Sequence, residues 1–361
     1  MRIIVFSAAV VWLALFSSSP AGAEPFTIEL DLNGRHIEGS PLVWSNSNVH
    51  LLARDGSLFE FRPQEAKNFR KLGAGFRSYS QGEMRAELIR EFGRGFDVTG
   101  TGHYLVVHPT GQRNKWATRF EELYRSFVHY FTARGFRPDS PQFPLVAIVF
   151  PSHRDFLRYV NRNGTKLPSG ALGYYTPVSN RILLYDVTPD ADEDDSNWQT
   201  NAETIIHEAA HQSAFNTGIH SRYTMPPRWV VEGLGTMFEA PGVWNSRKYP
   251  RLSDRVNRGQ LAAFQQYVAT GRPKGSLAQF VSSERAYATN IGAFYAEAWA
   301  LSFYLIETQP RQYIEHLRKT ASQPNFTQYG SPQRLRDFTQ VFGSDLEMQE
   351  AHFLRYIGNL K

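Results

Sequence analysis

The sequence predicts an α+β protein in which a part of mixed strands and helices is followed by a mainly helical part. Segments with the alternation of apolar and polar residues that is typical of β-strands occur before residue 187. Longer segments with apolar residues at helical spacing dominate from about residue 240. With 26 Phe, 17 Tyr and 7 Trp among 361 residues, the chain has enough large side chains for a substantial core.

The first 23 residues have the three parts of a secretory signal peptide. Arg2 supplies a positive start, an apolar run extends from Ile3 to Phe16, and Ala21-Gly22-Ala23 is a small-residue cleavage signal. An uncleaved membrane anchor is the alternative, but a bilayer span takes about 20 apolar residues, more than this run contains. We therefore expect a secreted or periplasmic protein with no membrane span after the signal is removed.

Composition excludes several classes of function. The formal net charge of +5 comes without a long Lys/Arg run, which favours weak attraction to anionic envelope polymers over nucleic-acid recognition. The chain has no cysteine, so disulfides, a cysteine nucleophile and a cysteine-ligated metal are excluded. The G-x-S-x-G motif of many serine hydrolases is also absent. The oligomeric state is not predicted.

Residues 24–72 are predicted to form a small β-rich N-terminal unit. Apolar and polar residues alternate in FTIELDLNG, and Asp55-Gly56 suits the turn of a hairpin. Residues 73–361 are predicted as one larger domain, whose helical subdomain starts at about residue 240. The clearest helix of this domain covers 115–134, where aromatic residues and leucine recur at helical spacing. Further elements are predicted as a helix at 81–93, a strand pair at 96–109, a strand at 144–150, a helix at 154–159 and a strand pair at 173–186.

The segment TNAETIIHEAAHQSAFNTG at residues 200–218 is predicted as a helix with a metal-binding motif. Thr200 and Glu203 have the spacing of a capping box at a helix start. His207 and His211 lie one turn apart on one face, so that both imidazoles can reach one metal ion. Three protein ligands and a water are typical of a catalytic zinc site, and the sequence predicts Zn²⁺ as the cofactor.

Glu208 projects from the neighbouring face of this helix, where it could hold and deprotonate a metal-bound water. The alternative interpretation is a partly buried helix whose two histidines are satisfied by hydrogen bonds. The apolar residues of the segment, among them Ile205, Ile206 and Phe215, indicate a buried helix. Two histidines and a glutamate are costly there unless they are paired or ligated, which favours the metal site.

The third metal ligand must come from further along the chain. A histidine six residues after His211 would be one solution, but that position is Thr217. The segment PPRWVVEGLGTMFEA is predicted as a second buried helix, and its Glu232 is the predicted third ligand. An exposed carboxylate or a partner for Arg228 is the alternative role of Glu232, and Glu239 is the fallback ligand.

HEAAH followed by WVVEG resembles the gluzincin type of zinc metallopeptidase. The block from about Gly73 to Glu307 is similar to a bacterial family of secreted zincin-like proteins of unknown function. The matching segments are EFGRGFDVTGTGHYLVVHP, FPLVAIVFPS, LGYY, IIHEAAHQSAFNTG, PPRWVVEGLGTMFE and FYAEAWALSFYL. The resemblance implies a zincin-like domain with a mixed β-sheet and an active-site helix. It also implies His207, His211 and Glu232 as zinc ligands and Glu208 as general base.

One position departs from better-known gluzincins. Some of them carry an aspartate four residues after the glutamate ligand, where it orients a zinc histidine, but this chain has Thr236. The outer partner of the histidines is therefore unassigned. By the same resemblance, the strand at 173–176 could pair with an extended substrate backbone, and an ordinary hairpin is the equal alternative.

The resemblance favours Tyr295, on a helix after the third ligand, as the catalytic donor to the tetrahedral oxyanion. His220, Tyr174 and Tyr175 are the other candidates, and zinc ligation by His220 would instead close the coordination shell and make the site structural. The predicted function is an exported zinc hydrolase that acts on peptide or protein substrates, such as envelope proteins or peptidoglycan peptides. The alternative is a non-catalytic exported binding or scaffold protein that retains a zincin fold. The presence of Glu208 favours the hydrolase.

Overall fold

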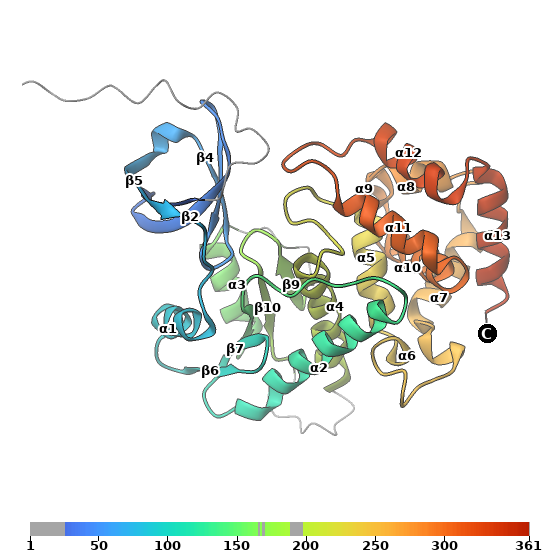
Figure 1. Cartoon of the computed structure of the whole chain (residues 1–361). Helices are drawn as coiled ribbons and strands as arrows, with labels where there is room; N and C mark the ends of the chain where they lie inside the picture. The colour runs from blue at the N-terminus through green and yellow to red at the C-terminus, as the bar shows by residue number, and fades with distance from the viewer. Residues whose placement is uncertain (1–25, 165–166, 168–169, 188–197, 361) are drawn as a thin grey trace, which may run out of the picture. The chain divides into compact units, whose positions relative to one another are not determined.

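The computed structural model describes residues 26–164, 167, 170–187 and 198–360. The described chain is a mixed α+β protein with two five-stranded sheets and many helices (Figure 1). It divides into two compact units, one that ends at Met84 and one that begins at Arg85. The predicted signal peptide lies outside the described residues. Within the described part of the chain, no helix has both the length and the hydropathy that a bilayer span requires.

The first unit is an antiparallel sheet with the strand order β4-β3-β2-β1-β5. The β1–β2 turn at Asn33-Gly34 has positive φ at both residues, a conformation that asparagine and glycine tolerate. The predicted hairpin at Asp55-Gly56 is present between β3 and β4. The strand bounds are β1 Phe26–Leu32, β2 Arg35–Trp44, β3 Val49–Ala53, β4 Leu58–Phe61 and β5 Ala66–Ala74, and a 3₁₀ turn covers Pro63–Glu65.

The second unit contains a mixed sheet with the strand order β6-β7-β8-β10-β9. The three central strands, β7, β8 and β10, run parallel, whereas β6 and β9 pair antiparallel at the two edges. Each edge strand belongs to a hairpin that the sequence predicts. The strand bounds are β6 Phe96–Gly100, β7 Tyr104–Pro109, β8 Leu145–Phe150, β9 Gly173–Thr176 and β10 Arg181–Tyr185.

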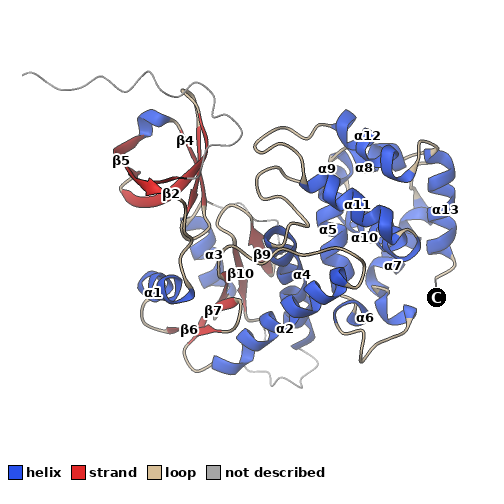
Figure 2. Cartoon of the chain, in the orientation of Figure 1, coloured by secondary structure: helices blue, strands red, loops and turns tan. Residues whose placement is uncertain are grey.

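Beyond β10, the described chain is helical, as Figure 2 shows. The long helices of this part agree with the helical periodicity that the sequence shows from about residue 240, whereas α6, α8 and α9 are too short to give a periodic signal. The helix bounds are α1 Gln81–Phe92, α2 Arg113–Thr132, α3 His153–Arg162, α4 Trp198–Asn216, α5 Arg228–Phe238, α6 Pro241–Trp244, α7 Arg258–Thr270, α8 Leu277–Ser282, α9 Arg285–Thr289, α10 Ile291–Thr308, α11 Pro310–Ala321, α12 Ser331–Phe342 and α13 Leu346–Gly358, with a 3₁₀ turn at Leu252–Arg255.

Helix α4 lies between the sheet and the C-terminal helices and has an apolar side toward each (Figure 1). Ile205 and Ala209 belong to the core cluster of the sheet, and Ile206 and Ala210 belong to the cluster of the C-terminal helices. Burial on two sides leaves little room for water around the polar residues of this helix.

The predicted N-cap of this helix at Thr200 is wrong. Helix α4 already includes Trp198, so Thr200 lies in its first turn and not at its N-cap. Its end agrees with the prediction, because Gly218 follows with a φ of +78°, which glycine adopts at helix ends without strain.

Candidate metal centre

The two histidines of HEAAH point toward the same spot from consecutive turns of α4. The Nε2 atoms of His207 and His211 are 2.9 Å apart, and their rings are perpendicular. His211 is buried and His207 is nearly so. The i, i+4 spacing of a helix produces this arrangement without help from the rest of the fold.

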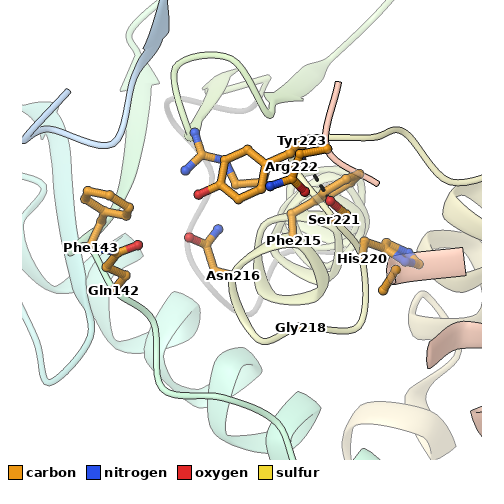
Figure 3. A pocket seen from close by; sticks show the side chains of 11 residues that line it. Gln142, Phe143, Phe215, Asn216, Gly218, His220, Ser221, Arg222 and Tyr223 are labelled. Carbon is orange, nitrogen blue, oxygen red and sulfur yellow. Dashed lines mark hydrogen bonds between the residues drawn. The ribbon is translucent and has the colours of Figure 1, made fainter. Parts of the chain in front are cut away.

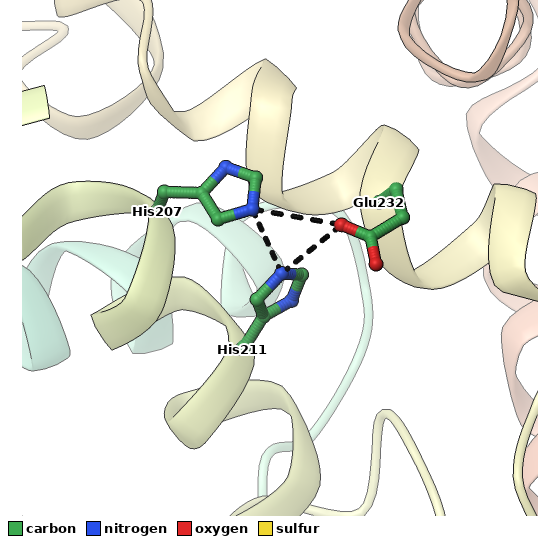
Figure 4. A group of neighbouring side chains, drawn as sticks. All are labelled: His207, His211 and Glu232. Atoms are coloured by element: carbon green, nitrogen blue, oxygen red, sulfur yellow. Dashed lines mark hydrogen bonds and ion pairs between the residues drawn. The ribbon is translucent and has the colours of Figure 1, made fainter. Parts of the chain in front are cut away.

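Glu232 approaches this pair from α5 (Figure 4). Its Oε2 atom lies 3.6 Å from Nε2 of His207 and 3.4 Å from Nε2 of His211. These three atoms form a triangle of the size that ligands about 2 Å from a common centre make, which is the usual zinc–nitrogen and zinc–oxygen distance. The structure therefore brings the three predicted ligands together as one possible metal-binding group.

Glycines in α5 allow this close approach, and their role was not predicted. A Cβ atom at Gly235 would lie 2.8 Å from Cε1 of His207 and 2.8 Å from Cε1 of His211. A side chain at this position would therefore displace both imidazoles. Gly233 allows α5 to pack closely against α10, since a Cβ atom there would collide with Ser302 and the carbonyl of Ala298.

Glu239 is the outer partner that the sequence left unassigned. Its Oε1 atom is 2.8 Å from Nδ1 of His207, on the side of the ring that faces away from Glu232. Asn257 donates to Oε2 of Glu239 at 2.7 Å and so orients the carboxylate. The hydroxyl of Thr236 donates instead to the backbone carbonyls of Glu232 and Gly233. The carboxylate that contacts His207 thus lies about one helical turn after position 236, where the sequence departs from the gluzincin pattern.

The histidines and carboxylates of this group change one another's pKa. Burial alone would lower the pKa of His207, but its contacts with Glu232 and Glu239 outweigh burial and hold the pKa well above the ordinary value. Burial would raise the pKa of Glu232, but its contacts with His207 and His211 hold it well below the ordinary value. The Nδ1 atom of His211 is buried without a hydrogen-bond partner among the described residues. Two imidazoles and an ionised carboxylate are a donor set that suits zinc.

Glu208 lies on the side of α4 that faces β9. Its Oε2 atom accepts a hydrogen bond of 2.7 Å from the backbone N–H of Tyr175, an outward-facing donor of this edge strand. Gly173 permits the approach, since a Cβ atom there would lie 3.2 Å from Cγ of Glu208 and 2.6 Å from Cγ2 of Thr204. Burial raises the pKa of Glu208, partly opposed by His207 and His211. A raised pKa suits a group that must both accept and release a proton.

The tyrosine candidates differ in their surroundings. Burial and then the carboxylate of Glu232 raise the pKa of Tyr295, which belongs to α10 and contacts that carboxylate. Tyr174, on β9, lies near Glu208 and Arg228. The Tyr175 hydroxyl instead donates to Asn180 in the core, at 2.9 Å. Tyr295 and Tyr174 therefore lie beside the candidate metal centre, and the Tyr175 hydroxyl points elsewhere.

His220 is not part of the possible metal-binding group. Its Nδ1 atom contacts the carbonyl of Ile219 at 3.0 Å, and its Nε2 atom has no partner among the described residues. Burial lowers its pKa to about 3, with a further contribution from His211. It lines a cavity of about 330 Å³ beside the end of α4, together with Phe215 and Ser221 (Figure 3).

A second group of possible ligands lies in the first unit, on β1 and β2. It contains Glu29, Glu38 and His36, of which His36 is exposed. Arg70 already donates to Glu29 at 2.5 Å, which neutralises that carboxylate. Partly exposed acidic groups with such partners are stable without a metal, and we assign no function to this group.

Residues 201–327 match a protein family described as "Protein of unknown function (DUF1570)". The matched segment includes His207, Glu208, His211, Glu232 and Tyr295. No curated protein matches the chain.

The solved structures that are similar to the chain include two of a zinc metallopeptidase. One is a glutamate-to-alanine mutant of the M1 zinc metallopeptidase from Deinococcus radiodurans, with a TM-score of 0.38 and 11% identity. The other is the same mutant bound to a Tyr-Ser-Ala substrate, with a TM-score of 0.37 and 12% identity. Each comparison covers 73% of this chain and 51% of the metallopeptidase chain, so this chain spans about half the length of those proteins.

Proposed function

We propose that this protein is an exported zinc-dependent hydrolase of the gluzincin type that cleaves peptide bonds. The observation that carries the proposal is the convergence of His207, His211 and Glu232, from two helices, on one spot beside Glu208. A structural zinc site has no use for a carboxylate at the position of Glu208. This position therefore favours a catalytic site over a non-catalytic scaffold.

His207, His211 and Glu232 would hold the zinc ion, and Glu239 would fix the ring orientation of His207. Bound zinc would lower the pKa of a water molecule and polarise the carbonyl of the scissile bond. Glu208 would take the proton of the attacking water and deliver it to the leaving amine. Its raised pKa supports this exchange, because a weaker acid accepts the proton of the water more readily.

Tyr295 would donate a hydrogen bond to the tetrahedral oxyanion. Its position beside Glu232 supports this role, and its raised pKa keeps the hydroxyl protonated as a donor. The same proposal includes a zincin-like domain and export by the N-terminal signal. It also includes a peptide or protein substrate from the cell envelope.

The test is hydrolysis of a broad peptide library by the purified protein, with and without a chelator, and with metal content measured by elemental analysis. Glu208→Gln is expected to lower the rate of hydrolysis by about 100- to 10,000-fold, the usual contribution of a general base, with bound zinc unchanged. Glu122→Gln, an exposed glutamate on α2, makes the same change in charge and is expected to leave the rate unchanged. Full activity of Glu208→Gln would remove this residue as the base, and a metal-loaded protein that cleaves no peptide would favour the scaffold.

A further inference from the structure

The second unit contains a cavity whose lining is rich in arginine and contains no acidic residue. The cavity has a volume of about 680 Å³, within the range of small-molecule sites. Its walls come from the second half of α2, from α6 with the loop after it, and from the 3₁₀ turn Leu252–Arg255. Arg125, Arg134, Arg247 and Arg255 line it, and none of the lining residues is an aspartate or a glutamate.

Two of these arginines are neutralised by carboxylates outside the lining. Arg125 donates to Glu121 at 2.9 Å, and Arg255 donates twice to Glu307, at 2.9 and 2.7 Å. The Arg255–Glu307 pair is bidentate, and pairs of this kind are geometrically well defined, whereas Arg125 forms a single bond. The carboxylates cancel most of the charge of these two arginines.

The other two arginines have no acidic partner among the described residues. The guanidinium of Arg134 lies 3.6 Å from the centroid of the Tyr130 ring and donates to the backbone carbonyl of Tyr130 at 3.1 Å. Stacking on an aromatic ring orients a guanidinium and leaves its charge uncompensated. Arg247 is exposed at the rim and forms no ion pair with another described residue. The cavity therefore carries a net positive charge.

Two buried donors beside the cavity also lack partners. The hydroxyl of Tyr130 and the indole N–H of Trp244, both residues of the lining, form no hydrogen bond with another described residue. A buried polar group without a partner is costly, which indicates that these donors are satisfied by something that the protein itself does not supply. Burial raises the pKa of Tyr130 to about 12, so that its hydroxyl remains a donor at neutral pH.

We propose that this cavity binds a small organic anion that carries a phosphate or a sulfate group. Arginine forks suit the oxygens of such groups, and unpaired donors with no competing carboxylate in the lining favour an acceptor-rich ligand. The volume exceeds that of a single oxyanion, and Trp244 and Val243 offer apolar surface for a carbon body. The proposal of this anion site does not depend on the proposed hydrolase activity.

The test is isothermal titration of the full-length protein with glucose 6-phosphate, glucose 6-sulfate and uncharged glucose. We expect the protein to bind at least one of the charged esters and to ignore glucose. The double variant Arg134→Gln/Arg247→Gln is expected to weaken binding at least tenfold. The control Arg162→Gln/Arg311→Gln removes the same charge from exposed arginines of α3 and α11 and is expected to bind as the native protein does.

Binding of only one ester identifies the phosphate or the sulfate as the natural group, and binding of both supports the shared oxyanion chemistry. The proposal is overturned if the native protein binds neither ester, or if the double variant binds as tightly as the native protein. Titration of Glu232→Ala separates this site from the candidate metal centre, since loss of binding in that variant would assign the anion to the metal.

Discussion

Two regions of the second unit bury histidines in opposite surroundings. At the candidate metal centre, Glu232 and Glu239 contact His207 and hold its pKa well above the ordinary value. In the aromatic cluster of α5, α11 and α12, His316 stacks on Trp229 at 5.6 Å and has no hydrogen-bond partner for either ring nitrogen among the described residues. Burial there lowers the pKa of His316 to about 3.

Helix α5 contributes to both regions from residues only three positions apart. Trp229 packs against His316, and Glu232 faces the histidines of α4. Burial is therefore common to both histidine sites, and the main difference is that two carboxylates contact His207, whereas Lys319 adds to the effect of burial at His316. A buried histidine with carboxylates is suited to hold a cation, whereas a buried histidine among aromatic rings is a neutral part of the core.

The largest expected effect comes from removing the shared carboxylate. Glu232→Ala takes away one predicted ligand, leaves His211 without its carboxylate partner and leaves His207 with Glu239 alone. We expect zinc affinity to fall by more than about 100-fold, beyond the effect of losing an outer partner. Competition with a chromophoric chelator measures this affinity. Equal zinc content in native protein and variant would show that another residue is the third ligand.

The next largest effect is expected from a substitution that tests how closely α5 approaches the two imidazoles of α4. Gly235→Ala places a methyl group 2.8 Å from each imidazole, and we expect about a 10- to 100-fold loss of zinc affinity as the rings are displaced. Gly259→Ala in α7 is the matched control, because a Cβ atom there meets nothing closer than 3.6 Å. That control is expected to leave zinc affinity unchanged and to raise the free energy of unfolding by about 0.5–1 kcal/mol. Native zinc affinity in Gly235→Ala would show that the centre is loosely packed.

Glu239→Gln tests whether the outer carboxylate positions His207. The glutamine keeps the shape but loses the charge that holds the Nδ1 proton, and we expect about a tenfold loss of zinc affinity with Glu208 chemistry otherwise intact. The loss is expected to shrink as pH falls, because Glu239 helps to raise the pKa of His207, and protons therefore compete with zinc more strongly in the native protein than in the variant. If Glu239→Gln loses no more zinc affinity than Gly259→Ala, Glu239 has no positioning role.

The smallest effect concerns the aromatic cluster. His316 stays neutral in the folded protein down to about pH 3, whereas in the unfolded chain it binds a proton below about 6.5. The unfolded state therefore binds more protons between these values, and the contribution of His316 to stability is lost as pH falls from 6.5 toward 3. His316→Phe is expected to flatten this part of the stability profile. Thermal unfolding at pH 4.5 and 7.5 measures the difference.

The control for this experiment is His352→Phe, which changes an exposed histidine of α13. It is expected to leave the pH profile of the melting temperature as in the native protein. If the melting temperatures of His316→Phe and of the native protein fall in parallel on acidification, the acid sensitivity comes from other groups. His220 is the next candidate, because burial lowers its pKa to about 3 as well.

The sequence alone determined the local features of this protein. The i, i+4 spacing on one helix places His207 and His211 together, and the alternating and periodic patterns predict the hairpins and the long helices. Only the tertiary structure decided the features that depend on contacts between distant segments. These features include the contact of Glu239 with His207 and the absence of a side chain at Gly235, which leaves room for both imidazoles. They also include the contact of β9 with Glu208 and the arginine-lined cavity. The reason is that local periodicity fixes which face a side chain occupies, whereas only packing fixes which other segment meets that face.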